Sequence, residues 1–121
     1  MSLHLELGAV IDASFADELA SPVEQKQDAM VVRLSNGVTL HVRYAAPDAY
    51  SLRWLYGDAE SGIDTAPLHP GLKTFPNHFH DANARVTADP LTRPDAPPAE
   101  NVKTVIRALL DDPMLGVKDI G

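Results

Sequence analysis

Apolar and polar residues alternate through two adjacent stretches near the middle of the chain, which is the period of a strand with one covered face. Ser35-Asn36-Gly37 lies between them. A two-residue Asn36-Gly37 turn would place apolar residues opposite polar ones. A three-residue loop, with Gly37 as its left-handed residue, instead pairs Leu34 with Val38, Val32 with Leu40 and Met30 with Val42. The pattern therefore predicts a hairpin over residues 29–44 with one apolar and one polar face.

The alternation continues in the stretch that follows Ala46-Pro47-Asp48. Tyr50, Leu52, Trp54 and Tyr56 alternate with Ser51 and Arg53, which predicts a third antiparallel strand with its aromatic side on the core. Gly57-Asp58 turns the chain, and Gly62-Ile63-Asp64 opens a fourth strand. After a loop with three prolines, residues 82–88 return as a short strand. We therefore expect an antiparallel meander of about four to five strands.

Two segments have helical spacing. The first runs from Leu3 to Leu19, although its first apolar residues also alternate like a strand. Four prolines between residues 89 and 98 predict a surface connector, and a C-terminal helix follows it until Asp112-Pro113. We expect this helix to cover the apolar face of the sheet, with the N-terminal helix as a second cover. The fold class is then α+β, in a single domain over residues 1–121 with a flexible tail at 113–121.

Composition narrows the function classes. The 121 residues include 17 acidic and 10 basic side chains, for a net charge of −7, which argues against a surface that binds nucleic acid everywhere but leaves a local basic patch open. The absence of cysteine excludes a thiolate zinc site and a cysteine nucleophile. No signal peptide and no apolar run of ~20 residues is present, so we expect a cytoplasmic protein without membrane contact. The composition is compatible with a monomer and with a homo-oligomer.

Candidate chemistry is concentrated in the segment 64–81, which holds three of the five histidines: His69, His78 and His80. In an extended chain His78 and His80 point the same way, so their rings can meet one ion or one phosphate. A carboxylate from Asp64 or Asp81 can complete a divalent-metal site, for example with His78, His80 and Asp81 as ligands. The alternatives are acid–base catalysis by the three histidines with Asp64, or side chains that only cap turns.

A second set of candidates lies on the polar face of the predicted sheet. The register above places Arg33, His41, Arg43 and Arg53 there together, with Thr39 and Ser51 between them. Such a surface can bind a phosphate backbone or an acidic partner. Charged residues on a solvated strand face are also normal in proteins that bind neither.

These motifs, in this order, resemble the TumE-type toxin family of bacterial type II toxin–antitoxin systems. The family pattern has a strand pair around an Asp-Gly turn, Tyr-Ser-x-x-Trp, Trp-Asp-Asn-Ala-Pro-His-His-Pro, Thr-Phe-Pro-His-His-x-His and a C-terminal helix. This chain has Asn36-Gly37, then Tyr50-Ser51-Leu52-Arg53-Trp54, Ile63-Asp64-Thr65-Ala66-Pro67-Leu68-His69-Pro70, Thr74-Phe75-Pro76-Asn77-His78-Phe79-His80, and the helix near residues 102–110. The resemblance covers roughly residues 30–110 and extends to Asp64, His69, His78 and His80.

The chain departs from the family pattern at Ile63, Thr65, Leu68 and Asn77. If the activity of the family needs its full histidine set, the departures imply a diverged or inactive relative. The resemblance implies a toxin-like component with an antitoxin partner, and it implies no settled reaction. Three hypotheses follow: a toxin that acts on RNA through the histidine-rich loop, a non-catalytic protein-interaction module, and a metal-dependent enzyme for a small molecule.

Overall fold

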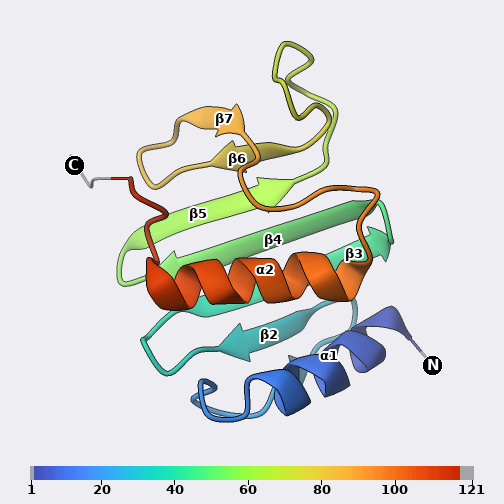
Figure 1. Ribbon diagram of the computed structural model, residues 1–121, viewed down its shortest axis with the longest axis vertical. Coiled ribbons are helices and arrows are strands. Elements are labelled where there is room, and N and C mark those ends of the chain that lie inside the picture. Colours follow the sequence, from blue (N-terminus) through green and yellow to red (C-terminus); the bar gives the residue numbers. More distant parts are fainter. Residues whose placement is uncertain (1, 118–121) are drawn as a thin grey trace.

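Seven strands form one antiparallel meander in a computed structural model that describes residues 2–117 (Figure 1). Neighbours in the sheet are also neighbours in the sequence. The strands are β1 Glu24–Gln25, β2 Met30–Arg33, β3 Thr39–Ala46, β4 Ala49–Tyr56, β5 Ala59–Asp64, β6 His78–His80 and β7 Val86–Ala88, and the helices are α1 Leu3–Ser14 and α2 Pro98–Asp111.

The α+β class and the meander are confirmed, but the prediction of four to five strands is too low. The sequence pattern missed β1 and placed β6 in a loop, because strands of two and three residues carry too little alternation to be recognised. The fourth strand, β5, also starts at Ala59, before the predicted start at Gly62.

The predicted register of the β2–β3 hairpin is confirmed. Met30 pairs with Val42, Val32 pairs with Leu40, and the Leu34 N–H donates to the Val38 carbonyl over 2.9 Å. Gly37 has a φ of 97°, which is the left-handed conformation that the three-residue loop requires. Asn36 Nδ2 also donates to the Leu109 carbonyl over 3.0 Å, so the turn is tied to the end of α2.

The third strand is confirmed with one exception. Tyr50, Leu52 and Trp54 are buried, but Tyr56 is 41% exposed, so its predicted place in the core is wrong. Tyr56 is the last residue of β4, next to the turn at Gly57, and the cover of the sheet does not reach its ring.

Both helices pack on the apolar face of the sheet, and α2 lies across β3 and β4 in Figure 1. They contribute Leu7, Ile11 and Phe15 from the α1 segment, and Val102, Val105, Ile106 and Leu109 from α2. The predicted extension of the first helix to Leu19 is wrong, because α1 ends at Ser14 and Leu19 forms a bridge with Leu34. The connector has no helix or strand until α2 begins at Pro98.

The segment after α2 lies against the core over its described part. Trp54 Nε1 donates to the Pro113 carbonyl over 3.2 Å, and Leu115 and Val117 pack on the core. The remainder of the predicted flexible tail, residues 118–121, lies outside the described residues. Neither α1 nor α2 is long and apolar enough to cross a membrane.

Candidate functional site

The sheet face opposite the helices carries both sets of candidate residues predicted from the sequence. The register aligns them in two adjacent rows: His41, Arg53, Gly62 and His80 in one, and Arg43, Ser51, Asp64 and His78 in the other. Neighbouring strands lie about 4.8 Å apart, so side chains in one row are within reach of each other. We call this surface, together with Arg33 on β2, the open face.

Asp64 on β5 binds two histidines of β6. His78 Nε2 lies 3.0 Å from Asp64 Oδ1, and His80 Nε2 lies 3.3 Å from Asp64 Oδ2. The other ring nitrogen of His78, Nδ1, lies 3.3 Å from the carbonyl oxygen of Pro76. His78 is 1% exposed, whereas Asp64 and His80 are only partly buried. Of the two histidines that bind Asp64, His78 is therefore buried and His80 is accessible to solvent.

His69 reaches the same place from the loop between β5 and β6. Its ring centroid lies 4.8 Å from that of His78 and 6.4 Å from that of His80, both with edge-on geometry. The structure thus brings together Asp64, His69, His78 and His80, which we call the Asp–His cluster. The sheet places three of them, and the loop places the fourth.

Asp81, the carboxylate of the predicted metal set, has a different role in the structure. Its Oδ1 accepts hydrogen bonds from the backbone N–H groups of Asn83 and Arg85, at 2.8 and 3.0 Å. Asp81 thereby holds the turn between β6 and β7. The structure brings Asp64, and not Asp81, to the imidazole nitrogens.

Three hollows on the open face connect the Asp–His cluster with the arginines. The first, of about 450 Å³, is lined by Arg53, Gly62, Asp64 and His80 among others. A second hollow of about 210 Å³ shares Arg53 with it and adds His41 and Arg43, and a third shares Arg43 and Asp64. The three are therefore contiguous around Arg43, Arg53 and Asp64.

Gly62 is the residue that keeps the first hollow open. A Cβ at this position would lie 3.1 Å from Arg53 Cγ and 3.2 Å from the Leu52 carbonyl oxygen, so a side chain here would displace Arg53. Sequence reasoning used Gly62 only as the start of a strand. The signal that identifies its role is a glycine inside a strand, which often marks a close approach or a ligand.

The charges of two arginines act on His41, although the whole chain is acidic. Partial burial, together with the charges of Arg53 and Arg33, holds the pKa of His41 below its ordinary value. Arg33 pairs with Glu24 over 3.2 Å and Arg53 with Glu60 over 3.6 Å, both on the surface. Arg43 has no carboxylate partner among residues 2–117.

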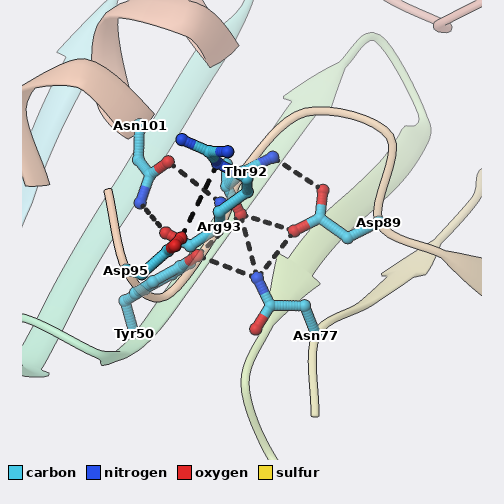
Figure 2. Close-up of polar contacts among 7 residues, drawn as sticks. All are labelled: Tyr50, Asn77, Asp89, Thr92, Arg93, Asp95 and Asn101. Atoms are coloured by element: carbon cyan, nitrogen blue, oxygen red, sulfur yellow. Dashed lines mark hydrogen bonds and ion pairs between the residues drawn. The ribbon is translucent and has the colours of Figure 1, made fainter. Parts of the chain in front are cut away.

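A buried polar network supports the strand that carries the histidines, as Figure 2 shows. Asn77 Nδ2 donates to Tyr50 Oη and to Asp89 Oδ2, both over 2.9 Å. Asp89 Oδ1 accepts from the backbone N–H groups of Leu91 and Thr92. Burial raises the pKa of Tyr50. The network fixes the residue before His78 to β4 and to the proline-rich connector.

The connector is in turn fixed to α2. Asn101 on α2 accepts from the Arg93 N–H over 3.1 Å and donates to the Arg93 carbonyl over 2.8 Å (Figure 2). Sequence reasoning missed Asn77 and Asn101, because their partners lie farther away along the chain. It also missed Asp89, although an Asp that binds backbone N–H groups two and three residues later is a recognisable turn pattern.

The departures from the TumE-type pattern fall outside the Asp–His cluster. Ile63 is in the core, and Thr65 Oγ1 accepts from the Tyr50 N–H over 3.0 Å. Leu68 is exposed, and Asn77 belongs to the buried network. Within residues 2–117, no hydrogen bond or ion pair joins the side chains of these four positions to Asp64, His78 or His80.

Asn77→Ala is expected to lower the free energy of unfolding by about 1–3 kcal/mol, because it leaves buried oxygens of Asp89 and Tyr50 without this donor. Urea denaturation measures the change. Gln27→Ala, which removes an exposed amide, is the matched control and is expected to stay within about 0.5 kcal/mol of the wild type. A loss from Asn77→Ala as small as the control would contradict a supporting role for the network.

Comparison with known proteins extends the resemblance seen in the motifs. No curated protein and no solved structure matches the chain. The family model described as Toxin TumE matches residues 4–114, which include α1 except its first residue, α2, all seven strands and the Asp–His cluster. The match covers most of the 121 residues. The chain therefore belongs to the TumE toxin family.

Proposed function

We propose that this toxin acts in the cytoplasm on RNA, which binds along the open face and is cleaved at the Asp–His cluster, and that a cognate antitoxin protein holds it inactive. One observation carries the proposal. The arginines and the Asp–His cluster occupy adjacent rows of one uncovered sheet face, and contiguous hollows join them.

Phosphate binding is supported by the lack of strong carboxylate partners for two of the arginines. Arg43 has no carboxylate partner among the described residues, and the exposed pair of Arg53 with Glu60 is of a kind that contributes little stability. A phosphate can therefore replace Glu60 at little cost. Arg33, Arg43, Arg53 and His41 together supply the local basic patch that the net charge of −7 left possible.

We choose RNA as the substrate class because its 2′-hydroxyl can be the nucleophile in a reaction that needs only acid–base catalysis. In transesterification the 2′ oxygen attacks the adjacent phosphorus and the bond from phosphorus to the 5′ oxygen breaks. One proton leaves the 2′-hydroxyl and another is delivered to the 5′ oxygen, so the reaction needs no further reactant. Imidazoles titrate near neutrality, and the Asp–His cluster offers three of them within contact distance of each other.

The experiment that tests the proposal compares an RNA oligonucleotide with DNA of the same sequence. The purified, untagged protein is expected to cleave the RNA to fragments that end in a 2′,3′-cyclic phosphate and to leave the DNA intact. Failure to cleave any single-stranded or structured RNA, in a preparation whose expression arrests growth, would contradict the proposed substrate.

Arg43→Gln and Arg53→Gln are each expected to weaken RNA binding and to reduce the slope of log affinity against log salt by about 1. Arg107→Gln is the matched control, since Arg107 lies on α2 next to Phe15 and away from the open face. Fluorescence anisotropy with labelled RNA measures both. Equal slopes for all three variants would place RNA elsewhere on the molecule.

A further inference from the structure

We infer that Asp64, His78 and His80 bind one divalent transition-metal ion. One ligand atom from each of the three side chains can be chosen so that all lie within 4.8 Å of one another. The use of this ion in catalysis rests on the proposed function, whereas its binding follows from the geometry of the three side chains.

The distances between the ligand atoms suit an ion. A tetrahedral site with metal–ligand bonds near 2.0–2.1 Å has ligand atoms roughly 3.3 Å apart. Asp64 Oδ1 and His78 Nε2 are 3.0 Å apart, and Asp64 Oδ2 and His80 Nε2 are 3.3 Å apart. Both distances are close to this spacing, so both histidine nitrogens lie where they can share an ion with the carboxylate of Asp64.

The hydrogen bond on the far side of His78 orients its ring for a metal. The Pro76 carbonyl oxygen can only accept, so a hydrogen on the Nδ1 atom 3.3 Å away completes this hydrogen bond. Nε2, the other ring nitrogen, faces the carboxylate of Asp64 at 3.0 Å. A carboxylate oxygen and an imidazole nitrogen at this distance can share a proton or a metal ion. Metal-binding histidines have this same arrangement, with the second nitrogen bonded to a backbone carbonyl.

Burial gives the site a closed end and an open end. His78 is 1% exposed, which protects one ligand from water, and His80 is 44% exposed. Asp64 and His80 also line the first hollow, together with Arg53. Two of the three ligands therefore face the hollow, which leaves a coordination position on that side for a substrate oxygen or water, as catalytic metal sites do.

Two imidazoles with one carboxylate select the class of ion. Imidazole is a good ligand for zinc and for other first-row transition metals, whereas calcium and magnesium prefer oxygen ligands throughout. We therefore expect Zn²⁺ and Co²⁺ to bind. With the ion present, His69 is the imidazole of the cluster that remains available for proton exchange, and a metal-bound water can exchange the second proton.

The site is tested with the full chain, purified without a histidine tag and stripped of metal with EDTA. Calorimetric titration with Zn²⁺ alone is expected to show one ion per chain, and titration with Co²⁺ alone to give the visible absorption of a bound ion. The absence of a saturable one-to-one isotherm with either ion would overturn the inference.

Variants identify the ligands. Asp64→Asn and His80→Ala are each expected to weaken Zn²⁺ binding by at least about 10-fold, the size of effect known for metal-site residues. Asp81→Asn and His41→Gln are the matched controls, because Asp81 holds a turn and His41 lies two strands away from Asp64. An equal loss with Asp81→Asn would assign the site to the other carboxylate and overturn this ligand set.

A measurement on the wild type does not depend on how the variants fold. Long-range ¹⁵N–¹H correlation spectra of the histidine rings are expected to show one imidazole with hydrogen on Nδ1, whose Nε2 resonance shifts when Zn²⁺ is added. Metal-induced shifts at all histidines alike would indicate scattered binding and would overturn the inference.

The metal site and the proposed function fail in different ways. Zn²⁺ binding without RNA cleavage would support the metal site and contradict the proposed substrate. RNA cleavage that is unchanged in EDTA, by protein that binds no Zn²⁺, would support the proposed function and contradict the metal site.

Discussion

Expression of this chain alone is expected to arrest growth, and Asp64→Asn and His80→Ala are each expected to abolish that arrest. Asp64 binds both His78 and His80, so its amide would lose the negative charge that orients and holds them. Loss of a positioned acid–base group typically lowers a rate by 10²–10⁴-fold. We expect a fall of about that size in RNA cleavage, with growth curves returning to those of cells carrying an empty vector.

The control for this prediction is Asp48→Asn, an equal change at an exposed position in the turn between β3 and β4. It is expected to remain fully toxic. Urea denaturation of Asp64→Asn checks that the fold is retained, since His78 is buried beside the altered side chain. Full toxicity of a folded Asp64→Asn variant would mean that the Asp–His cluster is only a structural clasp.

Trp54→Ala is expected to cause the largest loss of stability of any single change considered, about 3–5 kcal/mol. Trp54 is fully buried on β4, its ring stacks on Phe79 of β6 at 6.0 Å between centroids, and its Nε1 binds the Pro113 carbonyl. A domain of this size is typically stable by only about 5–15 kcal/mol, so the variant should unfold at much lower urea concentration.

Tyr56→Ala is the matched control, because it removes an aromatic ring from the same face of the same strand. Tyr56 is 41% exposed, and its loss is expected to cost less than about 1 kcal/mol. Circular dichroism in a urea series compares the two variants. Similar losses at positions 54 and 56 would contradict the boundary of the core after Trp54, which the alternating pattern alone placed two residues later, at Tyr56.

β4 connects stability with the proposed chemistry. Trp54 and Leu52 face the helices, and Arg53, between them, faces the hollow that also contains Asp64 and His80. The chemistry-bearing side chains thus stand on the solvent side of strands whose other side is anchored in the core. This separation explains how position 63, on the core side of β5, can differ from the TumE-type pattern while the Asp–His cluster is retained.

Local patterns were sufficient to predict the central hairpin, the third strand and the C-terminal helix. In these elements, apart from Tyr56 at the end of β4, the burial of each residue follows from the face on which its side chain lies, and Gly37 supplies the special backbone conformation of the turn. The same alternation also predicted that Arg33, His41, Arg43 and Arg53 share a face. The short strands β1 and β6 were not predicted, because two or three residues are too few to show an alternating pattern.

Only the tertiary structure decided how the candidate site is assembled. Pairing of β4 with β5 and β5 with β6 aligned Arg53 with Gly62 and His80, and Ser51 with Asp64 and His78, so that two separate sets of candidates became one surface. It also selected Asp64 over Asp81 as the carboxylate that faces the histidines. The physical reason is that these contacts depend on register between strands, and register is determined by the packing of the whole sheet against its helices.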